Sequence, residues 1–246
     1  MKRLVIIPAY NEERNIKCVV DSIKTSGLDV DIVVVNDGSI DDTSKASKEA
    51  GVRVIDLPIN LGIGGAVQAG FIYAYQMDYD VAIQVDGDGQ HDVKDLSKLI
   101  KAIENQEADL IIGSRFVEKS NYKPSITRNL GINFFSKLVS LLIKYTITDT
   151  TSGYRCIGKA AISLFAEYYP MDYPEVETIV YAHKMGLKVK EISVDMNPRL
   201  SGKSSISLLD GLYYLIKVTI MLLVTPKLHK LRNSNPAAYG GKNDYL

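Results

Sequence analysis

The feature that most constrains the fold of this chain is the alternation of short apolar runs with helix-like segments. Five mostly β-branched, apolar runs occupy residues 4–7, 32–35, 52–57, 81–85 and 109–113. After the first run, the sequence predicts a helix that is N-capped by Asn11, has apolar residues at helical spacing over 16–23 and stops at Gly27. After the next three runs, helical spacing or composition predicts helices over 40–50, 64–77 and 93–105. Strands that alternate with helices in this way predict an α/β domain with a parallel, doubly wound sheet.

Polar or glycine-rich turns follow the first four runs. These turns are residues 8–12, 36–39, 60–65 and 86–91. Ligands of doubly wound sheets bind beyond the carboxyl ends of the parallel strands. We therefore expect the four turns to meet at one rim of the sheet and to form a binding site there.

The turn after the fourth run, D-G-D-G-Q-H-D, carries the densest set of metal-type ligands. Asp86 and Asp88 repel each other unless a cation or several donors lie between them, and the glycines beside Asp88 allow a tight backbone. The oxygens of Asp86, Asp88 and Gln90 suit Mg²⁺ or Mn²⁺, ions that commonly bridge to substrate phosphates. The alternative is a solvated acidic turn before a helix whose N-terminus favours acidic residues.

Composition narrows the function. Acidic and basic residues balance at 29 each, so the basic excess expected of a nucleic-acid-binding protein is missing. Cys18 and Cys156 have no C-x-x-C spacing and indicate reduced thiols rather than a disulfide framework. Only about four apolar residues precede Pro8, too few for the core of a signal peptide. We expect a cytoplasmic catalytic part that binds no nucleic acid.

Seven motifs match one enzyme family in order. They are I-P-A-Y-N-E-E at 7–13, V-V-N-D-G-S at 34–39, N-L-G-I-G-G-A at 60–66, D-G-D-G-Q-H at 86–91, G-S-R at 113–115, D-T-T-S-G-Y-R at 149–155 and R-L-S-G-K-S-S at 199–205. Through these motifs the chain resembles the family 2 glycosyltransferases of the GT-A fold, close to the dolichol- and polyprenyl-phosphate sugar synthases. The resemblance implies a mostly parallel, doubly wound α/β sheet with helices on both faces. The glycine patterns of Rossmann dehydrogenases and P-loop enzymes are absent from their usual positions.

The resemblance implies roles for single residues. The nucleotide sugar would be held by Pro8, Tyr10, Glu12, Asp37, Asp86, Arg115 and Lys203. The metal ion, held by Asp86, Asp88 and Gln90, would neutralise the leaving nucleoside diphosphate. Asp88, Asp149 and Arg199 form the catalytic set, and the acceptor phosphate would be held by Arg128, Arg199 and Ser204. A simpler interpretation stays open for each of two residues: Asp37 is a turn residue, and Arg115 pairs with a nearby carboxylate.

Two kinds of acceptor are compatible with these residues. A lipid phosphate is largely dianionic at neutral pH, because the second pKa of a phosphate monoester is about 6, and it therefore needs cations more than a base. A sugar hydroxyl would need a positioned carboxylate, and Asp149 is then the candidate base. The basic residues of 199–205 favour the phosphate, although a loop that closes over the donor diphosphate would also explain them.

The chain after residue 206 differs from the part before it. We expect a catalytic domain over 1–206, an apolar, membrane-interfacial helix over 207–225, and a basic and then flexible tail over 226–246. A spanning helix needs about 20 apolar residues, and Lys217 within the run is costly there. Packing on the catalytic domain or in a dimer is the alternative. The segment 123–145 has too many apolar positions for a helix with one dry face, which fits a lipid-facing surface or burial under the sheet.

Together these features predict an inverting, metal-dependent hexosyltransferase. We expect it to move a sugar from a nucleoside diphosphate, UDP favoured over GDP, to a polyprenyl phosphate at the cytoplasmic face of the membrane. One alternative is a family 2 enzyme that extends a cell-surface polysaccharide or lipid-linked glycan through a sugar hydroxyl. Another is a catalytically silent, membrane-bound assembly partner, against which the intact 86–90 cluster argues. A homo-oligomer or a small membrane-protein partner stays open.

Overall fold

The computed structural model describes residues 1–118, 126–171, 174–197 and 216–222. Contacts divide the chain into two compact units, Met1–Ser205 and Ile206–Leu246. The sheet lies in the first unit, and residues 216–222 of the second unit are helical. Most of the segment 207–225, the tail 226–246 and the site candidates Arg199, Lys203 and Ser204 lie outside the described residues.

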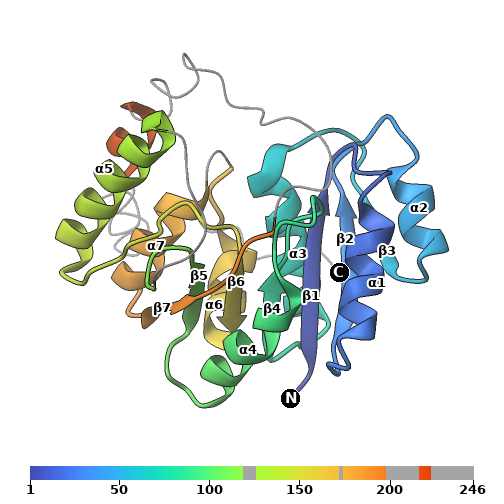
Figure 1. Ribbon diagram of the computed structural model, residues 1–246, viewed down its shortest axis with the longest axis horizontal. Coiled ribbons are helices and arrows are strands. Elements are labelled where there is room, and N and C mark those ends of the chain that lie inside the picture. Colours follow the sequence, from blue (N-terminus) through green and yellow to red (C-terminus); the bar gives the residue numbers. More distant parts are fainter. Residues whose placement is uncertain (119–125, 172–173, 198–215, 223–246) are drawn as a thin grey trace, which may run out of the picture. The chain divides into compact units, whose positions relative to one another are not determined.

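Within the described residues, one sheet of seven strands has the order β3-β2-β1-β4-β6-β5-β7 (Figure 1). The strands are β1 (Arg3–Ala9), β2 (Asp31–Asn36), β3 (Arg53–Asp56), β4 (Val81–Gln84), β5 (Leu110–Ser114), β6 (Arg155–Gly158) and β7 (Val189–Ser193). All five predicted strands are present, and β1–β4 pair in parallel, as β5 does with β7. The short strand β6 enters between β4 and β5 and runs antiparallel to both.

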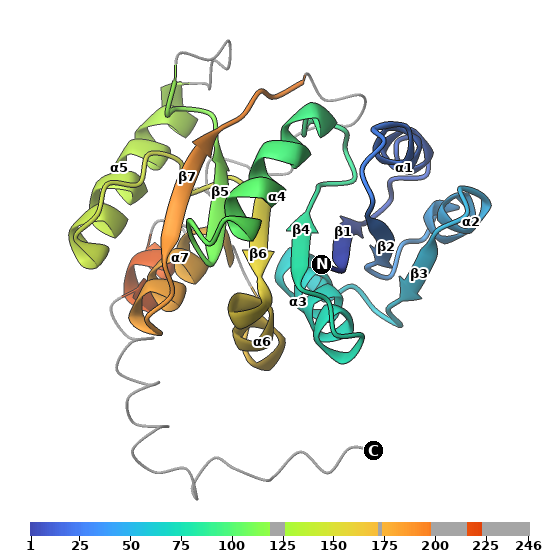
Figure 2. The ribbon, with the colours of Figure 1, turned by 90° about the horizontal axis from the view of Figure 1, so that it is seen from below.

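Helices cover both faces of this sheet (Figure 2). They are α1 (Ile16–Thr25), α2 (Thr43–Glu49), α3 (Gly62–Gln76), η1 (Val93–Asp95), α4 (Leu96–Glu104), α5 (Ile126–Ile143), α6 (Lys159–Glu167) and α7 (Pro174–Lys184). Helices α1 and α4 lie over one face, with α2 beside α1, while α3, α6 and α7 lie over the other. The predicted mostly parallel, doubly wound GT-A architecture is confirmed.

Burial explains why the strands are continuous apolar runs. Residues 4–9 of β1 are all buried, because helices pack on both faces of a parallel sheet. Gly70 of α3 permits one of these contacts, since a Cβ atom there would lie 2.3 Å from Cγ2 of Ile6. The helix can approach β1 this closely only with glycine at that position.

The predicted start of the first helix is wrong. Helix α1 begins at Ile16, after Asn15, rather than beyond Asn11. Asn11 has a φ of 56°, and its side-chain oxygen accepts a hydrogen bond from the backbone N–H of Ile40 at 3.0 Å. Asn11 therefore joins two rim loops instead of capping a helix.

Helix α5 lies at the β7 end of the molecule and packs on α7. One of its faces is buried, through Ile132, Phe135, Val139 and Ile143. Among the described helices, none combines the length and the apolar character required to cross a membrane.

Candidate active site

Four loops meet beyond the carboxyl ends of β1–β4, as the turn pattern predicts. The backbone N–H of Asp37 donates to the carbonyl of Ala9 at 2.9 Å, which joins the loops after β2 and β1. The Asp37 carboxylate accepts from the N–H of Leu61 at 2.7 Å, which joins the β2 loop to the start of α3. The β4 loop touches the same group, because a Cβ atom on Gly87 would lie 3.3 Å from the carbonyl oxygen of Pro8.

Gly38 makes the contact between the second and third loops possible. Its φ is 66°, and a Cβ atom there would lie 2.6 Å from the backbone N of Asn60. Both the left-handed backbone and the close approach require glycine. Asp37 beside it is buried and holds Leu61, so it has the predicted turn role, and its role toward a nucleotide stays a prediction.

Three further nucleotide candidates lie at the end of β1 and in the loop after it. Pro8 is buried within β1, whereas Tyr10 is 47% exposed. Glu12 is held at both ends: its N–H donates to Oγ1 of Thr43 at 2.8 Å, and its carboxylate accepts from the side-chain amide of Asn15 at 2.7 Å. Of these three candidates, Tyr10 has the most accessible side chain.

The carboxylates of the β4 loop are placed by their neighbours. Asp88 is buried, and one of its oxygens accepts from the N–H of Gln90 at 3.0 Å. Asp86 is partly exposed. Gly153, from the S-G-Y-R turn, packs against it, since a Cβ atom there would lie 3.0 Å from Oδ2 of Asp86. A Cβ atom at position 153 would force this carboxylate to shift by a few tenths of an ångström.

His91 holds the backbone of the same loop. Its Nδ1 accepts a hydrogen bond from the N–H of Asp86 at 3.1 Å, and its ring stacks on Tyr154 with 4.4 Å between centroids. Burial lowers the pKa of His91, although the Asp86 and Asp88 carboxylates oppose this. The neutral ring therefore carries its proton on Nε2, which lies 3.5 Å from Oδ2 of Asp86.

The donor set fits a hard divalent cation. Within the described residues, no three His, Cys, Asp or Glu side chains gather as a metal site. Mg²⁺ is commonly bound by one or two carboxylates, with substrate phosphates and water as the other ligands. Asp86 and Asp88 match that pattern, with Gln90 next to them. The fit is to an ion that is held jointly with a diphosphate.

Arg115 and Asp149 form a buried ion pair. Arg115 Nε and Nη2 donate to the two carboxylate oxygens of Asp149 at 2.6 and 2.7 Å, and the Arg115 backbone N–H donates at 3.1 Å. Arg115 is 3% exposed and Asp149 is 0% exposed. Thr151 also donates to Asp149, through its N–H and its hydroxyl, both at 3.3 Å. A substrate hydroxyl has no access to this carboxylate, so the geometry favours a structural role for Asp149 over that of a general base.

Glu191 of β7 extends this polar network. Its carboxylate accepts from the backbone N–H groups of Thr148 and Asp149, both at 2.7 Å. Burial raises the pKa of Glu191, while these hydrogen bonds oppose the shift. The loop before Asp149 is thereby fixed to the edge of the sheet.

Two side chains at the site were not resolved by sequence reasoning. Arg155, at the end of the S-G-Y-R turn, is buried and donates to the Ser152 carbonyl at 2.9 Å, to the Thr178 hydroxyl and to the Glu175 carbonyl. Glu175, in the first turn of α7, is close enough to Asp86 and to Arg155 that both charges act on its pKa, which burial raises. Glu175 is partly exposed, whereas Glu177, two residues further on, is buried in α7.

The structure does not describe the side chains of several candidate site residues. Arg128 belongs to the first turn of α5, but its side chain is not described. The residues of R-L-S-G-K-S-S lie outside the described part. The acceptor-phosphate set and Lys203 therefore stay predictions.

The fold and the paired carboxylates beyond β4 define a nucleotide-sugar transferase of the GT-A class. Residues 4–164 match the family described as glycosyl transferase family 2, and the chain belongs to that family. It is therefore a glycosyltransferase, which confirms the resemblance noted in the sequence.

Named relatives agree with this assignment, and a solved structure agrees with the fold. A UDP-N-acetylglucosamine–dolichyl-phosphate N-acetylglucosaminyltransferase of Methanococcus voltae is 33% identical, with 77% of this chain and 83% of the relative aligned. An undecaprenyl-phosphate mannosyltransferase of Micrococcus luteus is 29% identical over 84% and 88%, respectively. The glucosyl-3-phosphoglycerate synthase of Mycobacterium tuberculosis, crystallised with Mn²⁺ and UDP, superposes with a TM-score of 0.69 over 92% of this chain and 79% of the synthase, at 20% identity.

Proposed function

We propose that this glycosyltransferase moves a sugar, with inversion, from a nucleoside diphosphate to a polyprenyl phosphate at the cytoplasmic face of a membrane. The observation that carries the proposal is the similarity to relatives named for dolichyl- and undecaprenyl-phosphate acceptors, which extends over most of each chain. Inversion follows from a single displacement, in which the acceptor oxygen attacks the anomeric carbon opposite the leaving diphosphate.

The state of Asp149 supports a phosphate acceptor. Both of its oxygens are occupied by Arg115, so this carboxylate does not take a proton from an incoming hydroxyl. A phosphate monoester with a second pKa of about 6 is largely dianionic at neutral pH and attacks without a base. The chemistry at this rim then consists of orientation and charge stabilisation.

The donor would lie across the loops after β1, β2 and β4. In this arrangement Pro8, Tyr10, Glu12 and Asp37 hold the nucleoside, and UDP is favoured over GDP. Asp86, Asp88 and Gln90 would hold Mg²⁺ or Mn²⁺, which supplies positive charge to the leaving diphosphate. Arg115 holds the rim loop through Asp149, and its contact with the donor stays a prediction.

The decisive test is transfer of radiolabelled sugar from a panel of UDP- and GDP-sugars to short polyprenyl phosphate with Mg²⁺ or Mn²⁺. We expect one labelled, mild-acid-labile lipid product and a loss of turnover in Asp88→Asn. Asp92→Asn is the matched control, because Asp92 is a neighbouring carboxylate that caps η1, where asparagine also serves. Absence of any labelled lipid with all donors would reject the proposal.

The competing acceptor is a sugar hydroxyl on a lipid-linked glycan or polysaccharide. The observation that favours it is Glu175, a carboxylate at the rim whose pKa is raised by burial, as suits a general base. Label that appears only when a preformed glycan is supplied would support this alternative. Glu175→Gln should then abolish transfer, whereas transfer to a lipid phosphate should persist in that variant.

A further inference from the structure

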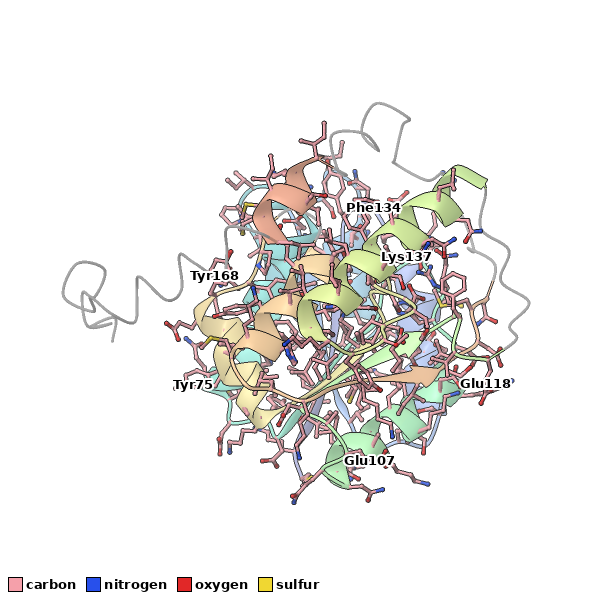
Figure 3. The ribbon with its side chains drawn as sticks, turned by 90° about the vertical axis from the view of Figure 1, so that its left-hand side faces the viewer. Tyr75, Glu107, Glu118, Phe134, Lys137 and Tyr168 are labelled. Atoms are coloured by element: carbon pink, nitrogen blue, oxygen red, sulfur yellow. The ribbon has the colours of Figure 1, made fainter. Side chains whose placement is uncertain are left out.

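Helix α5 has an apolar outer face as well as an apolar inner face. Leu130, Phe134 and Leu141 are 66%, 46% and 75% exposed. At about 100° per residue they fall within about 40° of one another around the helix, opposite the buried residues that face α7. Figure 3 looks onto this side of the molecule, where α5 runs across the front with Phe134 and Lys137 labelled on it.

The charges on this helix have one sign. Lys137 lies about 20° beyond this arc, on the same side of the helix, and Lys144 directly follows the helix. The sequence of α5 contains no aspartate or glutamate. Lysines beside exposed leucine and phenylalanine match an anionic lipid surface, because the cations attract headgroups while the apolar side chains enter the acyl boundary.

Helix α5 is also tied to the catalytic rim. The hydroxyl of Ser140 accepts from the N–H of Ile147 at 3.0 Å, and the hydroxyl of Ser136 donates to the carbonyl of Ile147. The next two residues are Thr148 and Asp149, which are fixed by Glu191 and by Arg115. A surface that fixes the position of α5 therefore also fixes the position of the loop that contains Asp149.

We propose that the α5 outer face, formed by Leu130, Phe134, Lys137 and Leu141, docks on an anionic lipid surface. Docking places the rim at headgroup depth, where the phosphate of a membrane-embedded acceptor lies. The docking rests on the exposure and charge of α5, and its catalytic purpose rests on the proposed function. The lipid surface is one of the two readings that the sequence left open for residues 123–145.

The absence of tryptophan from the chain permits a direct test. Phe134→Trp in the full-length protein introduces a single tryptophan at the centre of the face. We expect its emission to shift to the blue on mixing with phosphatidylcholine vesicles that contain phosphatidylglycerol, and to be quenched by brominated acyl chains. Tyr75→Trp is the matched control: Tyr75 is a similarly exposed aromatic residue on α3, and the emission of this variant should not respond.

Three outcomes would overturn the proposal. The first is an emission of the Phe134→Trp variant that does not change with vesicles, or changes no more than that of the Tyr75→Trp variant. The second is a blue shift that grows with protein concentration in the absence of lipid, which would show that a second copy covers the face. The third is an emission already blue in dilute, lipid-free protein, which would show that the chain covers the face itself.

A second arm separates the docking from the reaction. Leu130→Gln combined with Leu141→Gln should reduce transfer to vesicle-embedded polyprenyl phosphate by about tenfold or more, since two apolar side chains leave the bilayer. Transfer to a water-soluble, short-chain acceptor should stay unchanged. Equal rates with the embedded acceptor would contradict the proposal. Membrane insertion of the tryptophan in the Phe134→Trp variant, without transfer to any lipid phosphate, would refute the proposed function and leave the docking face standing.

Discussion

Replacing Asp149 by asparagine distinguishes a structural carboxylate from a catalytic base. In the native protein the two oxygens of Asp149 accept from Arg115 Nε, Arg115 Nη2 and the Arg115 backbone, and Thr151 adds two longer bonds. Asparagine keeps the shape but turns one oxygen into an amide donor. Either orientation places that donor against an Arg115 N–H, and the guanidinium stays buried without its counter-charge.

The expected destabilisation is large. Removing one partner from a buried, hydrogen-bonded ion pair costs about 3–5 kcal/mol. The pair belongs to this class, because neither side chain is more than 3% exposed. With a urea m-value of about 2 kcal/mol/M, the unfolding midpoint should fall by roughly 2 M.

Urea unfolding followed by circular dichroism measures this change. Asp21→Asn is the matched control, because Asp21 pairs with Lys17 at 2.9 Å while both side chains are at least half exposed. Exposed helical pairs of this kind contribute about 0.3–0.5 kcal/mol, so the midpoint should move little. In a double-mutant cycle, Arg115→Met should recover part of the loss in Asp149→Leu, because the unpaired charge is then removed as well.

Retained stability together with lost turnover would refute a structural role for Asp149. If Asp149→Asn unfolds within about 1 kcal/mol of the wild type but loses turnover, then the carboxylate acts in the reaction. Retained stability would also show that Arg115 pairs with another group, although both of its carboxylate contacts in the native protein are with Asp149.

Three further predictions concern other parts of the rim and the core. Gly38→Ala should lower stability and nucleotide affinity, measured by thermal unfolding and by titration with UDP, because its Cβ would strike the backbone of Asn60; Gly27→Ala, with a similar φ of 74° and open space around it, should cost only about 1 kcal/mol. Equal effects of the two substitutions would contradict the loop-contact argument. Arg155→Lys should lower the free energy of unfolding by roughly 3 kcal/mol, measured by urea unfolding, because one ammonium group cannot span the Ser152, Glu175 and Thr178 oxygens; a loss below about 1 kcal/mol would show that these hydrogen bonds do not hold the turn to α7. A thiol reagent should label exposed Cys18 in the native protein but Cys156 only on unfolding, because Cys156 is buried and burial raises the pKa of its thiol; two reactive thiols under native conditions would refute this.

Local sequence patterns predict the strands and helices whose apolar residues repeat with a regular period. The first four strands and their turns follow directly, because each run is long enough to mark a buried parallel strand. These local patterns do not predict strand β6. It is four residues long, R-C-I-G, and it comes directly after a turn that reads as a binding motif. Its place depends on antiparallel pairing with β4 and β5, a non-local interaction that no local period encodes.

The same distinction explains the outcome at the site. Spacing along the chain brings Asp86, Asp88 and Gln90 together, because they lie in one turn. Pairing across the chain decides the state of Asp149, whose partner Arg115 lies 34 residues away. A carboxylate in a motif therefore reads as a catalytic candidate until its partner is known. Helix α5 illustrates this too, since its apolar excess predicts two covered faces without saying which surfaces cover them.

The sparse metal ligands of the β4 loop lead to a thermodynamic expectation. Asp86 and Asp88 offer two carboxylates, and the described residues form no group of three acidic, histidine or cysteine side chains that could hold the ion alone. If the remaining ligands come from the donor diphosphate, the ion and the nucleotide must raise each other's affinity by the same factor. Calorimetry should then find weak binding of Mn²⁺ alone, and tighter binding once UDP is present, with UDP strengthened equally by Mn²⁺. Asp88→Asn should remove this coupling while leaving metal-free UDP binding in place, because the nucleoside is assigned to the loops after β1 and β2. Tight binding of Mn²⁺ without nucleotide would mean that the protein alone completes the coordination, and the two-carboxylate account of the site would be wrong.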